Sequence, residues 1–180
     1  MKLFEIITDT KILKQISEEV KLPLSKEDEE LVLDMVEYLR ASQDEELSEK
    51  YNIRPGVGLA AIQLGIKKRM LAVCLVEEKK TTSYALVNPV IVSHSVRECF
   101  LNTGEGCLSV PIDVDGYVYR PYKVTIKAYD AITKKKVTIK ARGYLSIILQ
   151  HEMDHLDGIL YYERIDKKEP FRLRQGAEVI

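Results

Sequence analysis

The sequence predicts an α+β fold in which antiparallel strands pack around a central C-terminal helix, with another helix near the N-terminus. Three observations predict it: apolar residues at helical spacing between 26 and 42, β-type runs between 70 and 141, and a second helical stripe after Gly143. The chain has 180 residues and is 46% hydrophobic, which is enough to bury a sizeable core. We therefore expect residues 1–180 to form a single domain.

The first predicted helix spans residues 26–42. Its apolar positions follow the helical period: Leu31, Val32, Met35, Val36 and Leu39. Ser25 followed by Asp28 resembles a capping box, which marks a helix start. The acidic stretch 44–50 extends or follows this helix until Pro55 and Gly56 interrupt it.

Strands are predicted from residue 70 onward. Residues 70–76 and 84–92 are β-like and apolar, and Pro89 indicates an edge strand or a bulge. The pentapeptide Val-Thr-Ile-Lys-Ala occurs at 124–128 and again at 137–141, with apolar and polar residues alternating. Two such runs joined by a polar turn predict a β-hairpin.

Charge is distributed unevenly along the chain. The formal net charge is −1, which argues against a protein held to nucleic acid by bulk charge, and we expect no sequence-specific nucleic-acid binding. Residues 120–142, however, contain eight basic side chains and one acid, Asp130. This stretch is either a solvated hairpin face or a patch for a polyanionic partner such as the ribosome, and composition does not choose between them.

Targeting and membrane signals are missing from the sequence. Charged residues interrupt the apolar run at the N-terminus, and the longest apolar stretch, residues 70–76, is far below the ~20 residues that span a bilayer. Three cysteines make a disulfide framework unlikely. We expect a cytoplasmic protein with no membrane partner.

The strongest pattern is His-Glu-Met-Asp-His at residues 151–155, on the predicted C-terminal helix. Residues four apart share one helix face, so both imidazoles can bind one metal ion while Glu152 lies beside it to move protons. The alternative is two histidines decorating an amphipathic helix. Because His151 and His155 are two of only three histidines, the metal site is favoured.

A catalytic metal site needs a third protein ligand and an open position. Zinc proteases with this helix motif supply a further histidine, which would fall at Tyr161, or a later glutamate, for which Glu163 and Glu169 are the obvious candidates. Both protease interpretations are strained. His94 and the three cysteines remain as candidates.

Cys107 stands out among the cysteines. It lies in the glycine-containing segment 104–111, where Gly106 allows a close backbone approach, and its thiolate could complete a set of one sulfur and two imidazoles. Cys74 and Cys99 lie in apolar, β-like segments, and we interpret them as buried cysteines that act as small hydrophobic residues.

A third segment spans residues 56–63 and has the sequence Gly-Val-Gly-Leu-Ala-Ala-Ile-Gln. Taken alone, it predicts a tight turn that leads into a packed element. It lacks the lysine and hydroxyl of a phosphate-binding loop. In order, the three segments 56–63, 105–109 and 150–155 resemble the signature of the peptide deformylase family, and the match runs from about residue 53 to 162. Segments 93–95 and 116–118 resemble its longer, Gram-positive-type class, although Ile62 stands where that class often has proline.

The resemblance implies a ligand set. Cys107, His151 and His155 should bind one divalent metal ion with water in the fourth position. Similar family members use Fe²⁺ physiologically, and Zn²⁺, Ni²⁺ or Co²⁺ can occupy the site. The central C-terminal helix is then a metal-binding helix.

The resemblance also implies an activity: removal of the N-formyl group from the initiator methionine of nascent polypeptides, with release of formate. A metal-bound hydroxide attacks the formyl carbon, and Glu152 acts as general base and then acid. The Gln63 side-chain amide and the Leu108 backbone N–H stabilise the developing oxyanion.

Substrate binding is implied along Val57, Gly58 and Gly106, where the formylmethionyl peptide would lie as an added strand. Ile148 either lines the methionine pocket or serves the core. We also expect an ion pair between Glu105 and Arg120 beneath the site. A zinc metalloprotease of the His-Glu-x-x-His type and a non-catalytic metal-binding domain remain as alternatives.

Overall fold

The computed structural model describes residues 2–180. The helices are α1 (Thr10–Leu13), α2 (Lys26–Ser42), α3 (Glu45–Tyr51) and α4 (Tyr144–Leu156), with 3-10 turns η1 (Ala61–Leu64) and η2 (Tyr161–Arg164). The strands are β1 (Gly58–Ala60), β2 (Met70–Glu77), β3 (Lys80–His94), β4 (Glu98–Phe100), β5 (Arg120–Pro121), β6 (Lys123–Asp130), β7 (Lys135–Arg142) and β8 (Glu178–Val179). None of the helices within residues 2–180 is long and apolar enough to cross a lipid bilayer.

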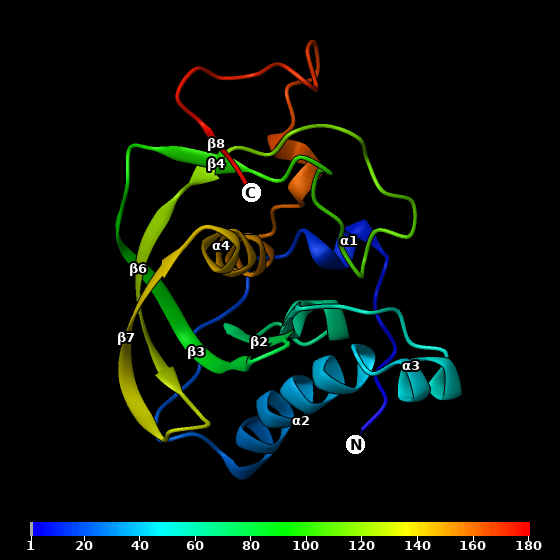
Figure 1. Cartoon of the computed structure of the whole chain (residues 1–180). Helices are drawn as coiled ribbons and strands as arrows, with labels where there is room; N and C mark the ends of the chain where they lie inside the picture. The colour runs from blue at the N-terminus through cyan, green and yellow to red at the C-terminus, as the bar shows by residue number, and fades with distance from the viewer. Residues whose placement is uncertain (1) are drawn as a thin grey trace.

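Two sheets enclose α4. The larger sheet has the strand order β1-β2-β3-β6-β7 and is antiparallel throughout, while the smaller has the order β5-β4-β8. Figure 1 shows α4 end-on in the middle of the molecule, with β3, β6 and β7 curving around one side and β4 and β8 above it. The predicted α+β fold with a central C-terminal helix is confirmed.

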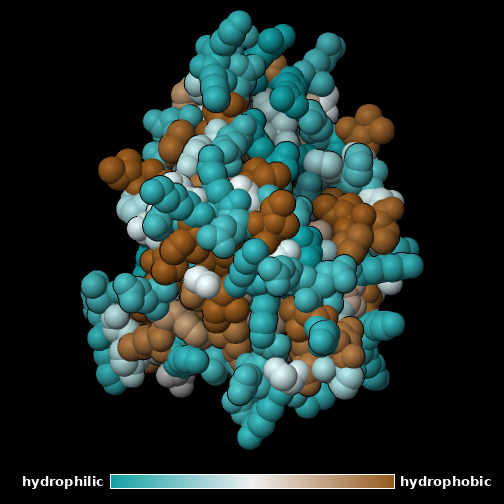
Figure 2. Space-filling model, turned by 180° about the vertical axis from the view of Figure 1, so that it is seen from behind, coloured by the Kyte–Doolittle hydropathy of each residue, from teal (hydrophilic) through white to brown (hydrophobic). Residues whose placement is uncertain are grey.

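Most of the core lies in two layers on either side of the larger sheet, and a smaller cluster surrounds Cys107 and Tyr161. One layer packs α2 against β2, through residues such as Met35, Leu39 and Ala72. The other packs α4 against β2, β6 and β7, through residues such as Leu149 and Ile126. Seen from behind, the surface carries apolar patches set among hydrophilic side chains (Figure 2).

The predicted first helix and its cap are confirmed. Ser25 Oγ accepts a hydrogen bond from the Asp28 backbone N–H, as an N-cap does, whereas the Asp28 carboxylate binds Lys68 instead of returning to the cap. The acidic stretch forms a separate helix, α3, which starts at an Asp44 cap.

The predicted hairpin is also confirmed, because the two copies of the pentapeptide pair with each other in β6 and β7. Pro89 marks a bulge: the register of β3 against β6 shifts between Val87 and Val90, and Asn88 has a φ of 50°. Strand β3 lies inside the sheet, so the edge-strand interpretation of Pro89 is wrong.

Helix α4 is buried along most of its length, from Ser146 to Leu156. Its polar side chains therefore need partners, and Ser146 Oγ and Gln150 Nε2 both donate to the Pro121 carbonyl. The chain leaves α4 at Gly158, which has a φ of +71° and passes so close to Lys14 that a Cβ would lie 2.4 Å from its carbonyl oxygen. Only glycine fits there.

Candidate active site and metal centre

Helix α4 presents three functional groups at the centre of the protein. His151 and His155 lie one turn apart with ring centroids 5.1 Å from each other, and Glu152 lies beside them. All three side chains are buried. The helix therefore brings two imidazoles and a carboxylate into a region of low dielectric.

Cys107 reaches the same place from the long loop between β4 and β5. Its Sγ lies 3.3 Å from His155 Nε2, and one ligand atom from each of Cys107, His151 and His155 lies within 4.8 Å of the other two. A thiolate and two imidazoles suit a borderline or soft divalent ion such as Zn²⁺, Fe²⁺ or Ni²⁺. Three protein ligands leave a tetrahedral position open, which is the pattern of a catalytic site.

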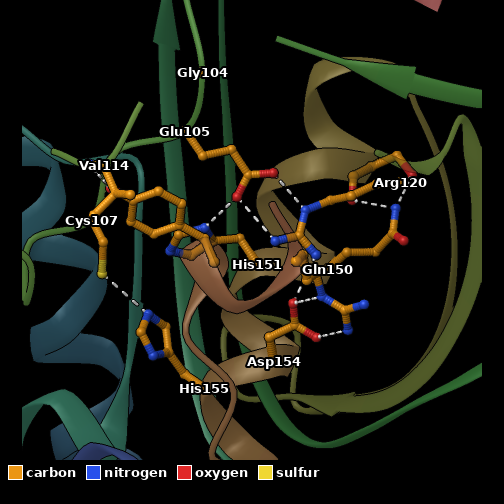
Figure 3. Close-up of polar contacts among 12 residues, drawn as sticks. Gly104, Glu105, Cys107, Val114, Arg120, Gln150, His151, Asp154 and His155 are labelled. Carbon is orange, nitrogen blue, oxygen red and sulfur yellow. Dashed lines mark hydrogen bonds and ion pairs between the residues drawn. The ribbon is translucent and has the colours of Figure 1, made fainter. Parts of the chain in front are cut away.

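The orientation of His151 is fixed by Glu105, as Figure 3 shows. Its Nδ1 lies 2.8 Å from Glu105 Oε2, which leaves Nε2 free to face an ion. Glu105 is held in turn by Arg120, whose Nε and Nη2 donate to the two carboxylate oxygens at 2.6 and 2.9 Å. The predicted pair of Glu105 and Arg120 is confirmed.

These contacts control the charges around the site. Burial by itself raises the pKa of Glu105, but hydrogen bonds from His151 and Arg120 outweigh it and lower the pKa to about 2. Burial holds the pKa of His155 well below its ordinary value. His155 is therefore a neutral imidazole, the form that binds metal ions.

Glu152 is placed differently from Glu105. Burial raises its pKa to about 7, and its Oε2 accepts no hydrogen bond from any residue between 2 and 180. The carboxylate faces β1, where a Cβ on Gly58 would lie 2.2 Å from Glu152 Oε1. The glycine is needed here because any larger residue would displace the carboxylate.

Gln63, in η1, supplies an amide to the same site. Its Oε1 accepts a hydrogen bond from the Ala60 backbone N–H, which turns its Nε2 toward Ser109 Oγ at 3.1 Å and Cys107 Sγ at 3.6 Å. The neighbouring Ile62, which stands where proline is frequent, is buried in the core.

Cys107, His151, Glu152 and Gln63 line one cavity of about 280 Å³, whereas His155 does not line it. Eight of the residues predicted for the site line it: Val57, Gly58, Gln63, Gly106, Cys107, Leu108, His151 and Glu152. Ile148 lines it too and also belongs to the core, so both of its predicted roles fit. Strand β1, at the edge of the sheet, forms one wall.

The other positions considered for a third ligand do not supply one. The Tyr161 hydroxyl accepts a hydrogen bond from the Val114 N–H, and its ring stacks on His151. Glu163 pairs with Lys14, and Glu169 with Arg172. The remaining candidates that do not reach the site are Cys74 and Cys99, both fully buried, and His94, which is exposed.

Sequence reasoning missed three charged residues. Arg54 Nη1 donates to the Cys107 and Val110 carbonyls, and thereby ties the ligand loop to the segment before β1. Asp154 and Arg164 extend the network beyond Arg120. Only Asp154 left a signal: an acid one turn from His151 on a helix that the sequence places in the core needs a buried partner.

Comparisons with known proteins agree with this geometry. Residues 4–171 match the family described as polypeptide deformylase. Peptide deformylase 2 of Geobacillus stearothermophilus is 48% identical over 166 residues, which cover 92% of this chain and 90% of that protein. Peptide deformylase of Listeria monocytogenes serovar 1/2a is 47% identical over 168 residues, covering 93% and 91%.

Solved structures give the same result. The crystal structure of peptide deformylase from Ehrlichia chaffeensis matches with a TM-score of 0.77 and 33% identity, over 94% of this chain and 91% of that one. The same protein in complex with actinonin matches with a TM-score of 0.76 and 32% identity, over 94% and 92%. The chain thus belongs to the polypeptide deformylase family.

Proposed function

We propose that the protein removes the N-formyl group from the initiator methionine of nascent polypeptides by hydrolysis and releases formate. One observation carries the proposal: Cys107, His151, the Glu152 carboxylate and the Gln63 amide line one cavity beside β1, and a ligand atom of His155 lies within 4.8 Å of those of Cys107 and His151. A hydrolase of this kind needs an ion, a proton carrier and an oxyanion donor within reach of one carbonyl. Since nascent polypeptides are made in the cytoplasm, we propose that it works there.

Cys107, His151 and His155 would hold the ion, for which we propose Fe²⁺, while the ligand set also suits Zn²⁺, Ni²⁺ or Co²⁺. The ion supplies Lewis acidity, which lowers the pKa of water and polarises a carbonyl. Glu105, by accepting a hydrogen bond from His151 Nδ1, keeps the ring turned for this role.

Glu152 would carry the proton. It takes one from the attacking water and delivers it to the departing amine of the peptide. Two features support this role: burial raises its pKa to about 7, close to the ambient pH, and its Oε2 accepts no hydrogen bond within residues 2–180. A carboxyl group with such a pKa can both accept and return a proton.

Gln63 and Leu108 would stabilise the oxygen of the formyl group as it becomes negative. The Gln63 amide is held through Ala60 and needs little reorganisation, and the Leu108 backbone N–H follows directly after Cys107. Losing one such donor typically costs ~10²–10³ in rate.

The peptide would lie along β1 as an added strand. Val57 and Gly58 on one side and Gly106 on the other line the cavity, and their backbone groups can pair with an extended peptide of any sequence. Ile148, at the wall of the same cavity, supplies an apolar contact for the methionine side chain.

Three variants test the proposal on formyl-Met-Ala. Glu152→Ala should keep the metal and lose ~10²–10⁴ in rate, because the proton carrier is gone. Cys107→Ser should lose both metal and activity, whereas Glu169→Ala, which removes one of the two glutamates considered for a protease, should change neither. Formate release by Glu152→Ala within tenfold of the unmodified protein would refute the mechanism. Cleavage of the Met-Ala peptide bond that survives Cys107→Ser would instead support a metalloprotease.

We also propose a contact with the ribosome through the outward face of the β6–β7 hairpin. Five exposed cations lie on this face: Lys123, Lys127, Lys136, Lys140 and Arg142. Core residues lie on the opposite face of the two strands. Within residues 2–180 none of the five forms an ion pair, whereas the neighbouring Lys134 pairs with Glu29. Arg120, from the same basic stretch, is buried and takes no part. A charged strip of this kind suits a phosphate backbone.

Pelleting with ribosomes at increasing salt tests this contact. The triple variant Lys127→Gln, Lys136→Gln, Lys140→Gln should pellet less and depend less steeply on salt. A control with Lys21, Lys79 and Lys167, three exposed lysines elsewhere in the chain, changed to Gln should pellet like the unmodified protein. Equal pelleting of both triple variants would rule the contact out.

A further inference from the structure

The ion-pair network behind the metal centre continues to the far side of α4. Arg120 Nη1 donates to Asp154 Oδ2 at 2.8 Å, and Arg164 binds the same carboxylate through Nε and Nη2, both at 2.6 Å. Figure 3 shows this succession of side chains, from His151 through Glu105 and Arg120 to Asp154. Every contact in it is a charge-assisted hydrogen bond.

The charges in this network balance only when Arg164 is counted. Glu105 and Asp154 are two buried carboxylates, and Arg120 is the one guanidinium buried between them, with its side chain 2% exposed. Arg164 contributes the second positive charge from an accessible position, with its side chain 40% exposed. Without it, Asp154 would depend on Arg120 alone for neutralisation.

Because Arg120 binds both carboxylates, a change in the charge around Asp154 also affects Glu105. Its fork binds Glu105 with Nε and Nη2 and reaches Asp154 with Nη1 only. If Asp154 lost its bidentate partner, the Arg120 guanidinium would be drawn toward it and away from Glu105. Because Glu105 turns the metal-facing ring of His151, a change at Arg164 would then reach the metal centre.

We propose that Arg164 is a positioning residue for the metal centre, acting through Asp154, Arg120 and Glu105 on His151. Arg164 ends η2, whose first residue, Tyr161, stacks on the His151 ring with centroids 5.9 Å apart. One short turn therefore supports this ligand in two ways: directly through the ring of Tyr161 and indirectly through the charge of Arg164. The inference rests on the proposed metal site.

The chain offers a matched control. Arg69 binds Asp157 at 2.8 Å, just after α4, and lines the same cavity of about 340 Å³ as Arg164 and Asp154. Both pairs join an arginine to an aspartate near the end of α4, although the side chain of Asp157 is 52% exposed and that of Asp154 only 10%. Asp157, however, forms no hydrogen bond with Arg120 or Glu105, so the control pair ends outside the network.

The test measures Co²⁺ binding, by competition with a chelator and by the visible absorption of the bound ion, together with thermal unfolding of the metal-free proteins. Arg164→Ala should bind Co²⁺ about 10–100-fold more weakly, as is typical when a partner behind a metal ligand is lost. Arg164→Lys, which keeps the charge, should recover part of the affinity, and Arg69→Ala should bind like the unmodified protein.

A double variant separates positioning from a general structural effect. In the Asp154→Asn background the carboxylate that Arg164 serves is gone, so Arg164→Ala should cause no further loss of affinity. Losses that add in full, or an Arg164→Ala protein that binds Co²⁺ as tightly as Arg69→Ala does, would overturn the inference. If the unmodified protein bound no Co²⁺, the metal site itself would fail, which is a distinguishable result.

Discussion

Removing Arg120 should destabilise the protein and weaken its metal site together. Arg120→Ala leaves the carboxylates of Glu105 and Asp154 buried without the guanidinium that binds both, at 2.6 and 2.9 Å to Glu105 and 2.8 Å to Asp154. Breaking one partner of a buried ion pair typically costs about 3–5 kcal/mol. A domain has only about 5–15 kcal/mol of stability in total, so this is a large fraction.

Urea unfolding of the metal-free protein measures the loss. Arg174→Ala is the matched control, since Arg174 also binds a glutamate, Glu98, at 3.0 Å, but with its side chain 51% exposed. Exposed pairs contribute only about 0–1 kcal/mol, so the control should unfold nearly as the unmodified protein does. Arg120→Lys, which keeps a charge but not the fork, should fall between them.

Metal affinity measured on the same variants completes the test. Arg120→Ala should retain metal about 10–100-fold more weakly, because Glu105 loses the partner that fixes its carboxylate toward His151. If Arg120→Ala matched Arg174→Ala in both free energy of unfolding and metal affinity, the reasoning about the buried network would be refuted.

Three further outcomes are expected. Gly58→Ala should keep the metal but lose activity, because its Cβ would lie 2.2 Å from Glu152 Oε1; full activity would contradict the placement of that carboxylate. Glu105 should stabilise the metal-free protein above pH 4.5, its ordinary pKa, and lose that contribution as the pH falls toward its folded value of about 2. The difference corresponds to about 3 kcal/mol, and acid unfolding of Glu105→Gln should lack it. Finally, removing the ion with a chelator should lower the unfolding temperature, and returning it at a hundred times its Kd should restore about 2.7 kcal/mol; unchanged unfolding would contradict a bound ion.

Periodicity and spacing predicted the long elements and the two histidines of the candidate metal site. The period of α2, the repeated pentapeptide of β6 and β7, and the four-residue spacing of His151 and His155 are local patterns, and local patterns survive in the fold. Pro89 shows the limit of a local pattern. Proline removes one backbone donor, and the chain accommodates this with a bulge inside the sheet as readily as at an edge, so the residue alone does not distinguish the two.

The sequence carried no pattern that would predict the very short strands or the contacts between charged residues far apart in the chain. Strand β8, of two residues, pairs in parallel with β4, about eighty positions earlier in the chain, and no period exists over so few residues. In the sequence, Arg54 and Arg164 look like ordinary surface arginines. They gain a role only because folding brings Arg54 to the Cys107 carbonyl and Arg164 to Asp154. When only the tertiary structure brings two residues together, the sequence around each residue gives no sign of the contact.

Formate release from formyl-Met-Ala tests the central claim most directly. The protein, purified without oxygen and loaded with Fe²⁺ or Ni²⁺, should release formate and free methionyl amine in equal amounts, and a chelator should abolish the reaction. The account would be contradicted by an intact formyl peptide with every ion tried, or by cleavage of the bond between methionine and alanine instead.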